Sequence, residues 1–171
     1  MNLPNSITLL RILSIPLLVF LLLSKHVPGG MLTADAVFII VAVSDYVDGY
    51  LARRLNEETP LGKFLDPLAD KILVLTALIC LVELKVIGSV PVVIIVVRDL
   101  TVTALRLAAA SSGRIIAAER LGKYKAAVLD IATAMLIVGM PYADMALWVG
   151  VALALISGTD YLMKNREVLY G

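Results

Sequence analysis

Four aspartates stand at helical spacing in a short stretch between two apolar runs. Asp45 and Asp48 are three residues apart, and Asp66 and Asp70 are four apart. In helical segments each pair projects from one face, and a tight helical hairpin brings the two pairs together. Four carboxylates in so small a space repel one another and cannot all stay ionised without counter-charge. The pattern therefore predicts a site that binds cations.

The ligand set indicates which cations these are. Carboxylates with no histidine or cysteine nearby favour a hard divalent ion such as Mg²⁺ or Mn²⁺. Four carboxylates suffice for two ions, and a two-ion site suits displacement at phosphorus because it stabilises both the attacking and the leaving oxygens. A cation or proton relay in a transporter would also use intramembrane carboxylates, although transporter sites usually lie near the midplane. Both readings are open on the acids alone, whereas Glu57 and Glu58, in the connection, are expected to be solvated surface charge.

Long apolar segments must position these acids. The chain has 171 residues, 60% of them hydrophobic, and a mean hydropathy of +0.95. Ordinary soluble domains contain about 45–50% apolar residues, so the composition predicts an all-α integral membrane protein. A spanning helix needs about 20 mostly apolar residues. Six runs are candidates for such helices: 7–24, 33–52, 67–87, 90–109, 125–142 and 145–163.

The basic residues predict how this six-helix bundle is oriented. They gather around the second connection, the fourth connection and the C-terminus: Arg53, Arg54, Lys63, Lys71, Arg114, Arg120, Lys123, Lys125, Lys164 and Arg166. By the positive-inside rule, both termini and the even-numbered connections face the cytoplasm, and so do the four aspartates. No repeat or composition break marks a second domain, so residues 1–171 are expected to form one transmembrane domain. The first run has no cleavage pattern and is expected to be retained.

Turn signals and the single cysteine complete this outline. The segments "VPGG" at 27–30 and "TPLG" at 59–62, with Pro91, fall at borders of the apolar runs. Pro141 predicts a stop or kink near the end of the fifth run. Cys80 lies within an apolar run and is expected to be a small buried hydrophobe.

The acidic stretch as a whole resembles a known signature. It reads Asp45-x-x-Asp48-Gly49-x-x-Ala52-Arg53, eight residues, Gly62-x-x-x-Asp66-x-x-x-Asp70. This resembles the CDP-alcohol phosphotransferases, integral membrane enzymes that join a CDP-linked group to an alcohol and release CMP, and all eight defining positions are present. Transport gives no reason for the glycine, alanine and arginine to accompany the acids, so the signature favours the enzyme class.

Further segments resemble one branch of that family, the bacterial phosphatidylglycerophosphate synthases. These segments are "NLPNSITLLRI", "GKFLDPLADK", "RDLTVTALRL", "ERLGKYK" and "SGTDYL". The resemblance implies transfer of the phosphatidyl group of CDP-diacylglycerol to sn-glycerol 3-phosphate, in the cytoplasmic membrane and on its cytoplasmic side. Enzymes that use inositol phosphate or serine share the eight residues, so another acceptor is the alternative. A homodimer is expected, and no nucleic-acid partner.

Carried over by position, the resemblance implies roles for the signature residues. Asp45, Asp48 and Asp66 resemble metal ligands, and Asp70 resembles the last aspartate, which lies at the metal centre and is the expected general base. The remaining signature positions are expected to bind the nucleotide: Gly49, Ala52, Arg53 and Gly62. Asn5 and Thr8, in the family-like opening, are expected to touch donor or nucleotide, and helix capping is the alternative for Asn5.

A dianionic acceptor such as glycerol 3-phosphate needs fixed positive charge. Arginine suits bidentate phosphate contact, and lysine acts as a point charge. The candidates, in order, are Arg106, Lys123 and Lys125, followed by Arg98, Arg114 and Arg11. Setting the topology or attracting anionic lipid is the alternative for the residues of the fourth connection. A structural ion pair with Asp99 or Asp130 is the alternative for Arg98 and Arg106. Asp99 also stands where relatives often have glutamate, which shortens its reach.

Overall fold

A computed structural model describes residues 3–24, 29–55, 60–111 and 120–166, with the backbone alone given for 3–10, 45–55, 60–67 and 120. All regular structure in these ranges is α-helical, which confirms the predicted fold class in its coarse form. The helices are α1 (Leu3–Leu23), α2 (Gly30–Leu55), α3 (Pro60–Glu83), α4 (Ser89–Ser111), α5 (Arg120–Ile137) and α6 (Ala143–Lys164). Each overlaps one of the apolar runs. α2 continues three residues past the apolar run 33–52 and ends at Leu55.

Two helices end before the apolar runs that predicted them. α3 ends at Glu83 and α5 at Ile137, because the chain turns at Lys85 and Gly139, whose φ angles are 59° and 70°. The next N–H in each case reaches back past the helix end: Val86 donates to the Leu81 carbonyl at 2.9 Å, and Met140 donates to the Met135 carbonyl at 2.8 Å. This is the Schellman pattern, which satisfies carbonyls that the helix leaves open. Hydropathy cannot detect it, because apolar residues continue through the turn.

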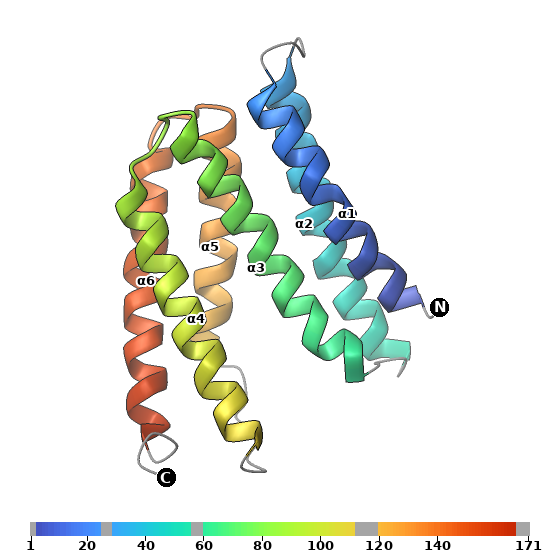
Figure 1. The fold of residues 1–171 in the computed structure, drawn as a ribbon, viewed down its shortest axis with the longest axis vertical. Helices are drawn as coiled ribbons and strands as arrows, with labels where there is room; N and C mark the ends of the chain where they lie inside the picture. The colour runs from blue at the N-terminus through green and yellow to red at the C-terminus, as the bar shows by residue number, and fades with distance from the viewer. Residues whose placement is uncertain (1–2, 25–28, 56–59, 112–119, 167–171) are drawn as a thin grey trace. The chain divides into compact units, whose positions relative to one another are not determined.

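The described residues pack as two compact units. The first unit comprises Met1–Ile87 and Thr133–Met140, and the second comprises Gly88–Ala132 and Pro141–Gly171. In the first unit α1 packs against both α2 and α3 (Figure 1). In the second, α4 packs against α6.

Both units have cores built from residues at helical spacing. In α3, Ala69, Leu73, Ala77 and Leu81 follow one another every four residues and are at most 1% exposed. In α6 the buried residues also recur every three or four positions: Ala143, Leu147, Gly150, Val151, Ala154, Ser157, Gly158 and Tyr161. A Cβ built on Gly150 would come within 2.5 Å of the Leu129 side chain of α5, so this glycine leaves room for that leucine.

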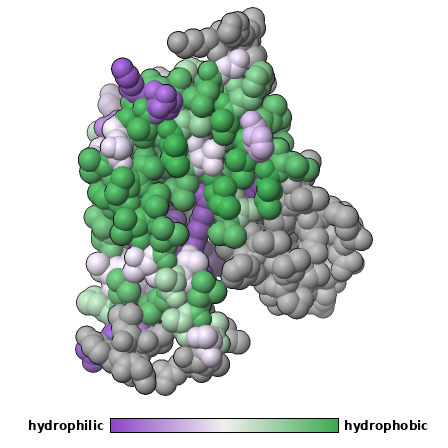
Figure 2. All heavy atoms as spheres, viewed as in Figure 1, coloured by the Kyte–Doolittle hydropathy of each residue, from purple (hydrophilic) through white to green (hydrophobic). Residues whose placement is uncertain are grey.

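The outer faces of these helices are also apolar. Figure 2 shows hydrophobic residues over most of the coloured surface on one face of the molecule. Among the described residues, α6 is the one helix long and apolar enough to cross a membrane, judged by length and composition alone. Shorter apolar helical stretches cover Arg11–Leu23 and Gly30–Ser44. Large exposed apolar patches mark contact with lipid or with partner proteins.

Candidate active site

The four signature aspartates lie on α2 and α3. Asp70 is half-buried, and one helical turn further Val74 is 7% exposed. Asp66 occupies the preceding position of the same row, since residues four apart share a helix face. Asp45 and Asp48 stand seven and ten residues after the buried Phe38 along α2. α2 and α3, the two helices that carry the acidic pairs, contact each other within the first unit.

The donor set on these two helices fits a hard divalent cation. The signature supplies carboxylates alone, without histidine or cysteine, and such ligands suit Mg²⁺ or Mn²⁺. Among the side chains that the structure describes, no three His, Cys, Asp or Glu residues lie close enough together to hold a metal ion. The side chains of Asp45, Asp48 and Asp66 lie outside that set, so their role as ligands stays a prediction.

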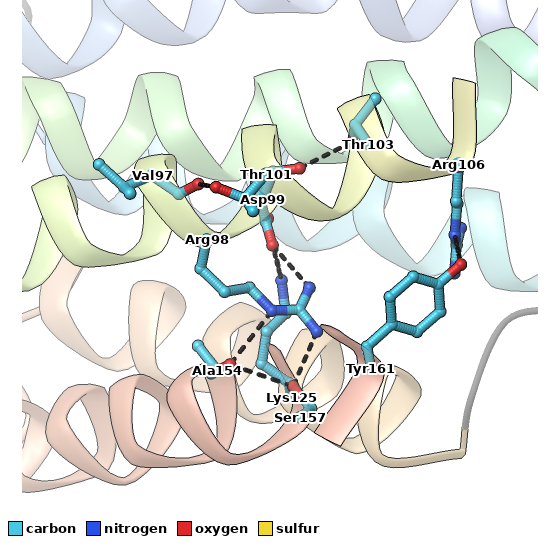
Figure 3. A network of polar contacts seen from close by, with 10 residues as sticks. All are labelled: Val97, Arg98, Asp99, Thr101, Thr103, Arg106, Lys125, Ala154, Ser157 and Tyr161. Carbon is cyan, nitrogen blue, oxygen red and sulfur yellow. Dashed lines mark hydrogen bonds and ion pairs between the residues drawn. The ribbon is translucent and has the colours of Figure 1, made fainter. Parts of the chain in front are cut away.

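A buried ionic network joins the three helices of the second unit (Figure 3). Asp99 in α4 is 5% exposed and accepts hydrogen bonds on both oxygens from Lys125 Nζ of α5, at 3.0 Å each. Arg98 Nη1 donates to Asp99 Oδ1 at 2.9 Å. One buried carboxylate therefore binds two cations, and this Arg98–Asp99–Lys125 cluster has a net charge of +1.

The rest of the Arg98 guanidinium is bonded to α6. Its Nη2 donates to Ser157 Oγ at 2.8 Å and its Nε to the Ala154 carbonyl at 3.1 Å. Gly158 makes room for this crossing, because a Cβ there would come within 2.9 Å of Arg98 Cγ. Arg98 thus donates from all three nitrogens to the protein itself. The ion pair with Asp99 that we considered as its alternative role is present.

Arg106 lies two turns further along α4 and has a different environment. It is half-buried, and its Nε donates to the Tyr161 hydroxyl at 3.1 Å. Its guanidinium carbon lies 5.4 Å from the centre of the Tyr161 ring, within the range of a cation–π contact. Figure 3 shows the arginine reaching from α4 to this ring on α6. Among the described residues, Tyr161 is the one hydrogen-bond partner of the Arg106 side chain, and it occupies one edge of the guanidinium.

The remaining predicted residues are distributed as follows. Lys123 is exposed on α5. Arg11 is 3% exposed on α1 and belongs to the first unit. Arg114 lies outside the described residues. For a further group the structure gives helix membership and no side chain: Asn5, Thr8, Gly49, Ala52, Arg53 and Gly62. The second unit thus brings together Arg98, Arg106 and Lys125 with Asp99.

Sequence reasoning did not assign roles to two residues of this network. These are Ser157 and Tyr161, both on α6. Their spacing could have identified them, because residues four apart share one face of a helix. On α6 these two residues carry hydroxyl groups within an otherwise apolar buried stripe. Their pairing with Arg98 and Arg106 could not be read from the chain, since 59 and 55 residues separate the partners.

Comparison with known proteins defines the class of this chain. The model of the CDP-alcohol phosphatidyltransferase family matches residues 1–156. The chain belongs to that family, as the eight-residue signature predicts.

Individual relatives are similar to the chain over nearly its full length. A CDP-diacylglycerol–glycerol-3-phosphate 3-phosphatidyltransferase of Bacillus subtilis (strain 168) is 42% identical, covering 98% of this chain and 97% of the relative. Proteins of the same name from Pseudomonas fluorescens and Escherichia coli (strain K12) are 37% and 34% identical. These alignments cover 99% and 98% of this chain, and 89% and 97% of the two relatives.

Proposed function

We propose that this protein transfers the phosphatidyl group of CDP-diacylglycerol to sn-glycerol 3-phosphate, giving phosphatidylglycerophosphate and CMP in phospholipid biosynthesis. The observation that carries this proposal is the near full-length similarity to relatives that share one name for that reaction. The family's eight signature residues are all present in the chain. Residues 1–171 act as a single transmembrane domain in this proposal.

The proposed setting is the cytoplasmic membrane, with the active site at the cytoplasmic side. The six helices span the bilayer, and both termini lie in the cytoplasm, as the distribution of lysine and arginine favours. The acyl chains of the donor stay in the bilayer, so the reacting phosphorus must be reached at headgroup level. Asp45 and Asp48 lie in the second half of α2 and Asp66 and Asp70 in the first half of α3, toward the connection between the two helices, which suits that level. A homodimer is proposed on family grounds.

Asp45, Asp48, Asp66 and Asp70 would hold two divalent ions, Mg²⁺ or Mn²⁺. When bound, such ions neutralise negative charge on the donor pyrophosphate and on the departing CMP. Beside the acids, Gly49 and Ala52 keep one face of α2 nearly free of side chains, which allows the nucleotide to approach the helix. Arg53 and Gly62 complete the nucleotide site, and Asn5 and Thr8 contribute to donor binding.

The chemistry requires removal of one proton and in-line displacement at one phosphorus atom. Asp70 accepts the proton of the acceptor hydroxyl. The hydroxyl oxygen then forms a bond to the phosphatidyl phosphorus, while the bond from that phosphorus to the CMP oxygen breaks. For such reactions the protein mainly positions the reactants and stabilises charge. Asp70 is half-buried in the first half of α3, where partial exclusion of water strengthens such interactions.

The acceptor phosphate is proposed to bind among the cations of the second unit. Arg106 and Lys123 make the direct contacts in this proposal. Arg98 and Lys125 already share Asp99, so they add positive potential and hold the helices at the right spacing. Arg114 and, on the first unit, Arg11 are the remaining candidate cations.

CMP release by the purified protein tests the proposal. The assay contains Mg²⁺, CDP-diacylglycerol and one acceptor at a time: glycerol 3-phosphate, inositol 1-phosphate or serine. We expect release with glycerol 3-phosphate alone, and its loss with a chelator. Asp66→Asn and Asp70→Asn should each lower the rate by about 100-fold or more, whereas Asp144→Asn, an exposed acid on α6, should not. Wild-type rates in both signature variants would refute the site, and release with another acceptor would refute the substrate assignment.

A further inference from the structure

Tyr161 is a buried tyrosine whose hydroxyl contacts the leading candidate for acceptor binding. The residue is 2% exposed and packs with Val102 and Leu105 of α4, with Leu162 against the same cluster. A ring enclosed in this way has few accessible rotamers. Its hydroxyl is therefore a fixed point from which a flexible neighbour can be oriented.

Arg106 is the neighbour that Tyr161 holds. The hydroxyl accepts a hydrogen bond from Arg106 Nε at 3.1 Å, and the ring lies 5.4 Å from the guanidinium carbon. A guanidinium has five N–H donors in a rigid plane. A bond at Nε occupies one edge of that plane and leaves the Nη1 and Nη2 groups, which form no hydrogen bond with the described residues.

Arg98 provides an internal comparison on the same helix. Its Nε, Nη1 and Nη2 donate hydrogen bonds to the Ala154 carbonyl, Asp99 Oδ1 and Ser157 Oγ, respectively. Both arginines therefore reach across from α4 to α6, but Arg98 is fully bonded within the protein, whereas Arg106 is anchored at one nitrogen. An oriented arginine whose two NH₂ groups are both left over matches the geometry of a phosphate group, which guanidinium binds through two parallel hydrogen bonds.

We propose that Tyr161 is a positioning residue of the acceptor site, which fixes the Arg106 guanidinium so that Nη1 and Nη2 face the phosphate of a phosphomonoester acceptor. This inference rests on the proposed function and deepens it. Tyr161 does not touch the substrate. By restricting the Arg106 side chain before the dianion binds, Tyr161 lowers the entropy that binding costs. The hydrogen bond therefore raises the affinity for the acceptor and does not change the rate of the chemical step.

Tyr161→Phe tests this role, because it removes the hydroxyl and keeps the buried ring. We expect the KM for glycerol 3-phosphate to rise about tenfold, as for the loss of one hydrogen bond. The kcat at saturating acceptor and the KM for CDP-diacylglycerol should stay within about twofold. Tyr124→Phe is the matched control, since Tyr124 is 64% exposed on α5, and its kinetic constants should equal those of the wild type.

A double-mutant cycle with Arg106→Lys separates positioning from packing. Lysine has no Nε–H fork for the tyrosine to orient, so adding Tyr161→Phe to Arg106→Lys should raise the acceptor KM no further. An unchanged acceptor KM in an active Tyr161→Phe enzyme would overturn the inference, and so would equal losses in the two backgrounds or a fall in kcat alone. Absence of glycerol 3-phosphate-dependent CMP release from the wild type would instead refute the proposed function.

Discussion

The buried carboxylate of Asp99 pairs with two cations, Arg98 and Lys125. This excess of positive charge determines how substitutions in the cluster change stability. Removing a charge from a buried ion pair costs about 3–5 kcal/mol when it leaves the partner uncompensated. Loss of the carboxylate leaves both Arg98 and Lys125 uncompensated, with side chains that are 11% and 7% exposed. Loss of Lys125 leaves Asp99 still neutralised by Arg98.

We therefore expect Asp99→Asn to lower the free energy of unfolding more than Lys125→Met does. Thermal unfolding of the purified variants in one detergent measures the difference. The double variant Asp99→Asn/Lys125→Met should be more stable than Asp99→Asn alone, because it buries one lone cation instead of two. Equal effects of the two single variants would show that the carboxylate is not shared as the distances indicate.

The sequence predicted which charged residues lie within the helix bundle, but it did not predict which groups each of them binds. Both roles considered for Arg98, phosphate ligand and ion-pair partner, follow from its position in an apolar run. The choice depends on Ser157 and Ala154, more than 50 residues away. Helical spacing along one segment cannot supply that information, because it depends on which helix lies opposite.

Among the elements, α3 and α5 end in the same backbone motif with different residues at the left-handed position. α5 has Gly139 there, which adopts positive φ without steric cost, and α3 has Lys85. A side chain at such a φ costs about 1–2 kcal/mol. We expect Gly139→Ala to lower, and Lys85→Gly to raise, the unfolding temperature of the protein in detergent. Shifts in the same direction for both substitutions would contradict this account of the two helix ends.

The contact between α4 and α6 depends on a missing side chain. At Gly158 a Cβ would come within 2.9 Å of Arg98 Cγ, and that atom lies near the backbone, where it cannot easily move. Gly158→Ala should therefore destabilise the protein by about 1–3 kcal/mol, the usual cost of overpacking. Gly88→Ala is the control, since nothing lies within 4 Å of a Cβ there. Equal stability of the two variants in thermal unfolding would show that Arg98 does not cross α6 at that point.

For the whole molecule, the existence and order of the helices were readable from the sequence, whereas their grouping into two units was not. Leu17 and Leu18 are chemically identical neighbours, yet one is 48% exposed and the other fully buried. In a membrane protein the lipid-facing side and the packed side are equally apolar, because lipid tails resemble leucine. Hydrophobic patterning therefore loses the contrast that identifies the core of a soluble protein.

The single cysteine makes the proposed membrane topology testable. In a Cys80→Ser background, Asn2→Cys and Gly171→Cys place thiols at the two ends, and Lys25→Cys places one in the first connection. We expect a membrane-impermeant thiol reagent to label only the Lys25→Cys variant in intact cells. The two terminal variants should react after permeabilisation. Labelling of either terminus in intact cells would contradict the charge-based orientation.

The neighbouring positions of Arg98 and Asp99 have a consequence for biogenesis. In the proposed topology α4 enters the bilayer before α5 and α6 are synthesised, and an isolated charge within a spanning segment opposes insertion. Because Arg98 bonds its own sequence neighbour at 2.9 Å, α4 brings a counter-ion for this arginine with it, and Arg106 alone leaves the helix with a net charge of +1. In this account Lys125 meets an acid that is already present when α5 follows.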